Sequence, residues 1–107
     1  MESLFEDIKA LVANEDVLVS EHGYDELAED GLFLDEILPA IKTSVVLETY
    51  SDYHKGPCLL LLQWDSDGNP IHVVWGIPKG QIAPAVLVTA YRPDVKRWTR
   101  DFRRRKP

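Results

Sequence analysis

The second half of the chain contains four short apolar segments separated by turns, and this spacing restricts the fold more than any other feature. The segments begin near Ser44, Cys58, Ile71 and Ala85. The clearest break between them is the run DSDGNP (65–70), which is rich in turn-forming residues. Parallel strands need crossover connections of about a dozen or more residues, which these gaps do not supply. The sequence therefore predicts an antiparallel meander of about four strands.

The first half of the chain carries signals for helices. Ser3 and Glu6 form a capping-box pattern ahead of a segment with apolar residues at helical spacing. Ser20 is a suitable N-cap for a second helix, which we expect from residue 21 to about residue 30, with Gly31 closing it. The sequence thus predicts at least two capped helices before the strands begin.

A third helical segment is expected over residues 34–42, but Pro39 lies well inside it and predicts a short or kinked helix. Between the first two helices lies only a short apolar segment at residues 17–19. Helices followed by strands predict an α+β fold, with the N-terminal helices packed on the antiparallel sheet. A length of 107 residues fits one domain, with residues 93–107 forming a basic C-terminal tail.

Charge is distributed unevenly along the chain. Residues 1–91 carry four basic and 16 acidic side chains, a net of −12, whereas residues 92–107 carry eight basic and two acidic ones, a net of +6. Such a tail either contacts RNA or another acidic partner, or neutralises its own acidic body, or remains a solvated terminus. Trp98 within it either packs on the body and holds the tail, or is an exposed anchor for a partner.

Several classes of protein do not fit this composition. The longest apolar run, residues 58–62, is far shorter than the roughly 20 residues that span a bilayer, so no membrane association is expected. The N-terminus lacks the basic and apolar regions of a signal peptide. Cys58 is the single cysteine, which excludes an internal disulfide, fits a cytoplasmic protein and favours a core thiol over a nucleophile.

Four side chains are suited to metal-independent phosphate chemistry. His72 lies on one expected strand, and Tyr91 and Arg92 end the next. A histidine can act as general acid or base, an arginine can bind phosphate oxygens, and a tyrosine can donate a hydrogen bond. His22, with Glu26 four residues later, is a possible base with an orienting carboxylate.

Each of these residues also has a structural interpretation. His72 alternates with apolar residues on its strand, so it is either functional or simply packed or exposed there. His22 can bond a local backbone group at its helix start, and Arg92 can pair with an acid of the body. The three histidines have no metal-binding spacing, so we expect neither a metal nor a cofactor.

The order of the motifs resembles the DUF4258 family over about residues 17–105. The matching motifs are SEH (20–22), GL (31–32), SVVLETYSDY (44–53), CLLLLQW (58–64), GNPIHVVW (68–75), VLVTAYRPD (86–94) and Trp98. The resemblance implies the small helix-plus-sheet fold of RelE-like, barnase-like and BrnT-like proteins, many of which are metal-independent ribonucleases neutralised by an antitoxin. Where relatives commonly carry arginine on the helix after the histidine, this chain has Glu26 and Asp30.

The resemblance implies a toxin-like endoribonuclease whose partners are RNA and a cognate antitoxin. From the side-chain chemistry above, the catalytic residues that we expect are His72, Arg92, Tyr91 and His22. The RNA contacts that we expect are in the basic tail, namely Arg97, Arg100, Arg103, Arg104, Arg105 and Lys106. The alternative is a non-catalytic protein-interaction domain with the same fold.

Overall fold

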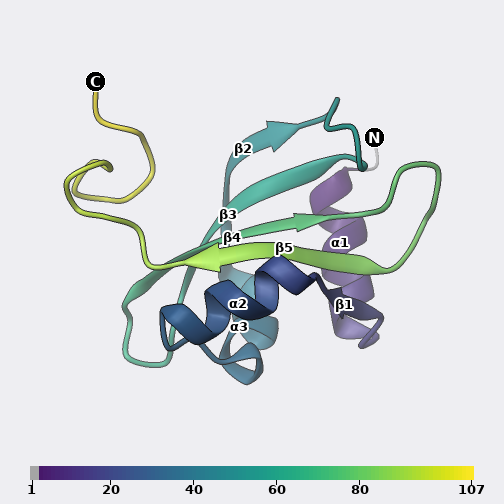
Figure 1. Cartoon of the computed structure of the whole chain (residues 1–107), viewed down its shortest axis with the longest axis horizontal. Coiled ribbons are helices and arrows are strands. Elements are labelled where there is room, and N and C mark those ends of the chain that lie inside the picture. The colour runs from purple at the N-terminus through teal and green to yellow at the C-terminus, as the bar shows by residue number, and fades with distance from the viewer. Residues whose placement is uncertain (1–2) are drawn as a thin grey trace.

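The computed structural model describes residues 3–107, which form three α-helices, one 3₁₀ turn and a five-stranded sheet (Figure 1). In chain order these are α1 (Leu4–Ala13), β1 (Val17–Val19), α2 (Glu21–Glu29), α3 (Leu34–Ala40), η1 (Ile41–Thr43), β2 (Val45–Tyr50), β3 (Cys58–Trp64), β4 (Pro70–Gly76) and β5 (Ala85–Tyr91). The strands are arranged in the order β1-β5-β4-β3-β2. The fold is α+β, as the sequence predicts.

The predicted meander is confirmed, but the expected number of four strands is wrong. β2, β3, β4 and β5 pair antiparallel in succession. A fifth strand, β1, pairs parallel to β5, with Val17 opposite Ala85 and Val19 opposite Leu87. A segment of three residues is too short to show strand alternation, and its partner lies far away in the sequence. The sheet is therefore mixed.

The predicted helix caps are confirmed. The Ser3 side chain accepts a hydrogen bond from the Glu6 N–H at 3.1 Å, and the Ser20 side chain accepts one from the Gly23 N–H at 2.9 Å. After α2 the chain turns at Gly31, whose φ of +63° is favourable for glycine. These caps set where α1 begins and where α2 begins and ends.

α3 is short, as the proline predicts. It ends at Ala40, two residues before the expected end, and the chain continues as the 3₁₀ turn η1. Pro39 has no N–H to donate to the preceding turn, so regular α-helical bonding cannot continue through it.

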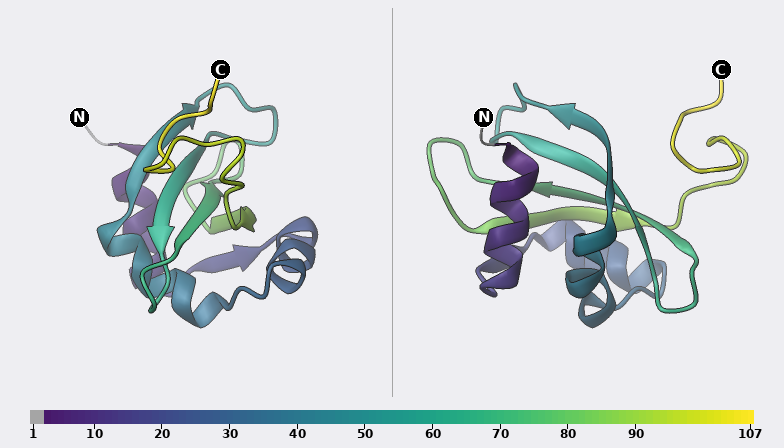
Figure 2. Two further views of the ribbon diagram at one scale, coloured as in Figure 1. Left: turned by 90° about the vertical axis from the view of Figure 1, so that its left-hand side faces the viewer. Right: turned by 180° about the vertical axis from the view of Figure 1, so that it is seen from behind.

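The two faces of the sheet are covered differently. α1 and α3 lie against one face, and α2 runs beside β5 (Figures 1 and 2). That face contributes alternate side chains of the strands to the main core: Leu59, Leu61, Ile71, Val73, Trp75 and Leu87. On the opposite face Leu60, Leu62 and His72 are equally buried, although none of the helices within residues 3–107 lies over that face (Figure 2). The C-terminal tail curls over this second face instead (Figure 2).

α2 lies unusually close to β5. A Cβ atom added at Gly23 would lie 2.8 Å from the Leu87 carbonyl oxygen. Ser20, just before the helix, donates its hydroxyl proton to the Val88 carbonyl at 2.9 Å. This contact fixes the beginning of α2 at one border of the second sheet face. Within residues 3–107, no helix combines the length and the apolar character needed to cross a membrane.

Candidate functional site

Five polar side chains gather on the second face of the sheet, and we call them the sheet-face cluster. Its members are Glu48 and Tyr50 on β2, His72 on β4, Tyr91 on β5 and Arg105 in the tail. They share a face because Glu48 pairs with Leu60 of β3, and His72 pairs with both Leu62 and Tyr91. Residues distant in the sequence therefore lie on the same face of the sheet, on either side of β3.

His72 is completely buried, and both of its ring nitrogens are hydrogen-bonded. Nε2 lies 2.8 Å from the carbonyl oxygen of Phe102, and Nδ1 lies 3.3 Å from the hydroxyl of Tyr91. A carbonyl only accepts, so Nε2 carries the proton and Nδ1 accepts from Tyr91. The geometry therefore describes a neutral imidazole that joins β5 to the tail.

The tail is folded rather than extended. The ring of Trp98 meets that of His72 edge to face, with the centroids 4.3 Å apart, and Trp98 is 4% exposed. Trp98 also forms an isolated β-bridge with Arg105. Phe102 adopts a φ of +63°, an uncommon backbone conformation for this residue, while its carbonyl bonds to His72. Of the two interpretations of Trp98, the one in which it packs on the body is confirmed.

Glu48 and Arg105 form the accessible part of the cluster. The Nε and Nη2 atoms of Arg105 donate to the two carboxylate oxygens of Glu48, each at 3.2 Å. The guanidinium also lies 4.7 Å from the centroid of the Trp98 ring. The hydroxyl of Tyr50 donates to the same carboxylate. A carboxylate, a guanidinium and a phenol are thus joined in one network that is open to solvent on one side.

The network sets the protonation state of its members. The hydrogen bonds from Arg105 lower the pKa of Glu48. Burial and the bond to Glu48 raise the pKa of Tyr50 to about 12. Burial lowers the pKa of His72 and raises the pKa of Tyr91. At neutral pH the cluster therefore contains an ionised carboxylate, a neutral imidazole and two protonated phenols.

Arg92 does not join this cluster. Its Nη2 lies 2.8 Å from the Asp65 carboxylate, and its Nη1 donates to the Pro70 carbonyl at 3.3 Å. Its backbone N–H donates to the Asp30 carboxylate at 2.8 Å. The guanidinium is therefore occupied in fastening the end of β5 to the β3–β4 turn.

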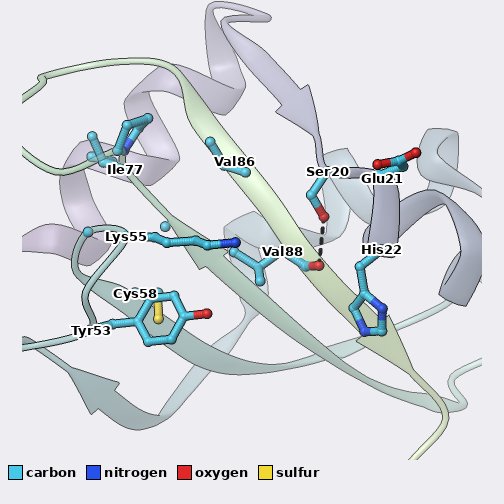
Figure 3. Close-up of a pocket in the computed structure, with 12 residues that line it drawn as sticks. Ser20, Glu21, His22, Tyr53, Lys55, Cys58, Ile77, Val86 and Val88 are labelled. Carbon is cyan, nitrogen blue, oxygen red and sulfur yellow. Dashed lines mark hydrogen bonds between the residues drawn. The ribbon is translucent and has the colours of Figure 1, made fainter.

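His22 lies on a different part of the same face. Its Nε2 is 3.3 Å from the Glu26 carboxylate, so the predicted side-chain pair exists. With Ser20 it lines a pocket formed by the start of α2, the β2–β3 loop and the sheet (Figure 3). We call this the α2–loop pocket.

Glu26 and Asp30, the acids at positions where the resemblance leads us to expect arginine, both have internal contacts. Glu26 pairs with His22, and Asp30 accepts the N–H of Arg92. Their negative charges thus hold α2 and the end of β5 in place.

The cations of the tail fall into two groups. Arg105 is bound to Glu48, and Arg97 is 3.9 Å from Asp94 of the same segment. The remaining cations have exposed side chains without an ion pair within residues 3–107, namely Lys96, Arg100, Arg103, Arg104 and Lys106. This exposed group keeps its full charge available to an anionic partner.

Sequence reasoning missed Glu48 and Tyr50. Both lie in VVLETY, where a bulge between Val46 and Glu48 interrupts regular alternation. The signal for them is a carboxylate two residues before a tyrosine at the end of a strand that begins with three apolar residues. Their partner, Arg105, is one of many tail arginines, and nothing in the sequence distinguishes it. Among the described residues, no group of three or more His, Cys, Asp or Glu side chains is placed to hold a metal ion.

Comparison with models of known protein families finds a match. The family model of DUF4258, described as a domain of unknown function, matches residues 19–92. This range covers α2, α3 and β2–β5 and ends before the tail. Neither the curated proteins nor the solved structures contain a significant match to the chain.

Proposed function

The chain belongs to the DUF4258 family, and we propose that it is a toxin-like, metal-independent endoribonuclease related in fold to the RelE-like and BrnT-like toxins. The observation that carries this proposal is the sheet-face cluster, in which Glu48, Tyr50 and Arg105 share one hydrogen-bonded network at the surface. A carboxylate, a phenol and a guanidinium can supply the base, the acid and the charge stabilisation that RNA cleavage without a metal requires.

The proposed reaction is transfer of the phosphoryl group to the 2′-oxygen. Glu48 takes the proton of the 2′-hydroxyl, the bond from the 2′-oxygen to phosphorus forms, and the bond from phosphorus to the 5′-oxygen breaks. Tyr50 gives its proton to the leaving 5′-oxygen and regains one from Glu48, to which it is bonded. Arg105 turns from Glu48 to the phosphate and stabilises the charge that develops there. At the end of the step Glu48 is again ionised and Tyr50 is again protonated.

His72 and Tyr91 have a positioning role in this proposal. His72 holds the Phe102 carbonyl, three residues before Arg105, and Tyr91 holds the ring of His72. Arg92 fastens the end of β5 to the β3–β4 turn. The exposed tail cations contact the phosphates of the RNA backbone. His22 acts at the α2–loop pocket rather than at the reacting phosphate. A cognate antitoxin would then cover the cluster or the tail.

The test is cleavage of end-labelled RNA by the purified protein in the presence of EDTA, with free RNA and with RNA on ribosomes. We expect products with 2′,3′-cyclic phosphate ends. Glu48→Gln should lower the rate at least about 100-fold, because it removes the base. Asp35→Asn, which changes an exposed carboxylate of α3, is the matched control. Absence of cleavage on both substrates by a folded protein rejects the proposal.

A second candidate is a non-catalytic protein-interaction domain. The observation that favours it is that the polar groups of the cluster are already bonded to one another. Arg105 and Glu48 neutralise each other, and both nitrogens of His72 have hydrogen-bond partners. β2 is the last strand of the sheet, so its outer edge is available to pair with a strand of a partner. Binding through that edge should persist in high salt, whereas RNA binding should not.

A further inference from the structure

The α2–loop pocket lies on the same sheet face as the cluster, at the end of the sheet where Cys58 begins β3 and Gly76 ends β4, and has a volume of about 600 Å³ (Figure 3). It is hollow because its floor carries little side-chain volume. Gly76 of β4 has no side chain, and a Cβ there would lie only 3.0 Å from the Cβ of its cross-strand neighbour Cys58. α2 and the β2–β3 loop rise on either side of this low floor.

The pocket combines an apolar floor with a cation. Val86 and Val88 of β5 line one side, and Tyr53 and Lys55 of the β2–β3 loop line the other. The Lys55 ammonium extends across the pocket toward the Val88 and Ser20 side (Figure 3). Within residues 3–107, Lys55 has no ion-pair partner. Of the four basic side chains in residues 1–91, Lys55 is the one that lines this pocket, and its ammonium attracts an anionic group to the hollow.

From this arrangement we infer that the α2–loop pocket binds one nucleotide unit of RNA. The phosphate contacts the Lys55 ammonium, and the base lies against Val86 and Val88 with the ring of Tyr53 beside it. Unpaired bases bind to apolar and aromatic side chains in this way, and the volume falls within the roughly 300–1,000 Å³ usual for small-ligand sites. His22, which Glu26 orients, lies at the rim next to the sugar or phosphate.

This inference deepens the proposed function and rests on it for the identity of the polymer. Gly76 in the pocket and His72 in the cluster are four residues apart on β4, roughly 13 Å along the strand. A single RNA strand held in the pocket can therefore continue along the same face to the Glu48 and Arg105 network. The pocket would then hold a nucleotide that flanks the cleaved bond.

The test is a titration of the ¹⁵N-labelled protein with adenosine monophosphate, adenosine and inorganic phosphate, followed through the backbone amide shifts. We expect the monophosphate to shift the amides of Lys55, Gly76 and Val86. Adenosine and phosphate alone should each bind at least about tenfold more weakly, because each makes only part of the interactions.

Three variants make the result specific. Lys55→Ala should weaken binding of the monophosphate at least about tenfold, because it removes one charge-assisted hydrogen bond. Val86→Phe places a larger side chain in the pocket and should abolish binding. Lys79→Ala, a nearby cation that does not line the pocket, should leave binding unchanged. Shifts confined to the tail, or an affinity that Lys55→Ala and Val86→Phe leave unaltered, would overturn the inference.

Failure of the inference and failure of the proposed function are distinguishable. Binding of the monophosphate does not require cleavage. A protein that binds it in the pocket but cleaves no RNA would therefore support the binding site and contradict the ribonuclease activity. A protein that cleaves RNA but does not bind the monophosphate in the pocket would support the activity and contradict the binding site. With both correct, Lys55→Ala raises KM for RNA with kcat kept, whereas Glu48→Gln lowers kcat.

Discussion

His72 is completely buried, and the tail that covers it also provides one of its hydrogen-bond partners. Its position on a strand could be predicted from IHVVW, where it alternates with apolar residues. Its burial could not, because what covers it is the tail, 30 residues later, through the Phe102 carbonyl. The sequence therefore identifies the residue and leaves open whether it is functional or packed, which depends on that long-range interaction.

The buried imidazole predicts a stability that depends on pH. Burial holds the pKa of His72 below its ordinary 6.5, so the unfolded chain takes up a proton before the folded chain does. The contribution of His72 is complete above pH 6.5 and is lost as the pH falls toward the folded pKa. The hydrogen bond to the Phe102 carbonyl and the charge of Glu48 raise the pKa of His72 and oppose this effect, whereas the charge of Arg105 reinforces it.

The measurement is urea unfolding at pH 5, 6 and 7. We expect the free energy of unfolding to fall between pH 7 and 5, and His72→Gln to reduce that slope by at most about 1.4 kcal/mol per pH unit. His54→Gln, in an exposed turn, should leave the slope as in the wild type. Equal slopes for all three proteins would contradict the assignment of a neutral, buried His72.

Arg105 should matter more than its neighbours to the folding of the tail. It is bound to Glu48, whereas Arg104 is exposed and its side chain has no ion pair within residues 3–107. A double-mutant cycle with Glu48→Gln and Arg105→Ala should give a coupling of about 0.5–1 kcal/mol, modest because both side chains are partly exposed. Urea unfolding measures it, and Arg104→Ala is the control. An equal loss of stability from Arg104→Ala would show that the Arg105 pair does not hold the tail.

At the scale of elements, the sequence predicts correctly those helix boundaries that depend on neighbouring residues. The caps at Ser3 and Ser20 and the end at Gly31 depend on residues within one turn, and the sequence places them correctly. β1 depends on pairing with β5, far along the chain, and no local pattern over three residues reveals it. The predicted number of strands is therefore wrong, while the predicted order of the meander is right.

Gly23 in α2 gives a prediction opposite to that of helix propensity alone. In an isolated helix Ala is favoured over Gly by about 1 kcal/mol. Here the added methyl group would lie 2.8 Å from the Leu87 carbonyl and force α2 away from β5. We expect Gly23→Ala to lower the free energy of unfolding by about 1–3 kcal/mol.

Thermal or urea unfolding checks this expectation. Asp25→Ala, at an exposed position on the same helix, is the control and should be neutral or slightly stabilising. A more stable Gly23→Ala protein would show that α2 is not held against β5 as closely as described. Because α2 forms one wall of the α2–loop pocket, the same variant should also weaken nucleotide binding.

At the scale of the whole molecule, the reversal of charge organises the structure. The acidic body, residues 1–91, and the cationic end of the chain meet where Arg105 binds Glu48 and where Arg92 binds Asp65. The reversal itself could be predicted from the sequence. Which cations pair with the body and which remain exposed could not, since that depends on how the tail turns at Trp98 and Phe102.

The exposed tail cations predict a salt-dependent interaction with RNA. Replacing Arg103, Arg104 and Lys106 together by alanine should weaken RNA binding and reduce the slope of log affinity against log salt by about 0.7 for each phosphate that these side chains neutralise. Fluorescence anisotropy with labelled single-stranded RNA at several salt concentrations measures both. Replacing Lys9 and Lys42, which lie on the body, should change neither. An unchanged slope in the tail variant would exclude the tail from RNA binding.

The most direct measurement is induced expression in bacteria of the wild type beside Glu48→Gln and Arg105→Ala, with growth and total RNA integrity as readouts. We expect growth arrest and RNA decay with the wild type, and relief of both by either substitution in a protein that still folds. Normal growth and intact RNA with a folded, well-expressed wild type would contradict the proposed ribonuclease activity. The sheet-face cluster would then be the fastening of the tail in a protein-interaction domain.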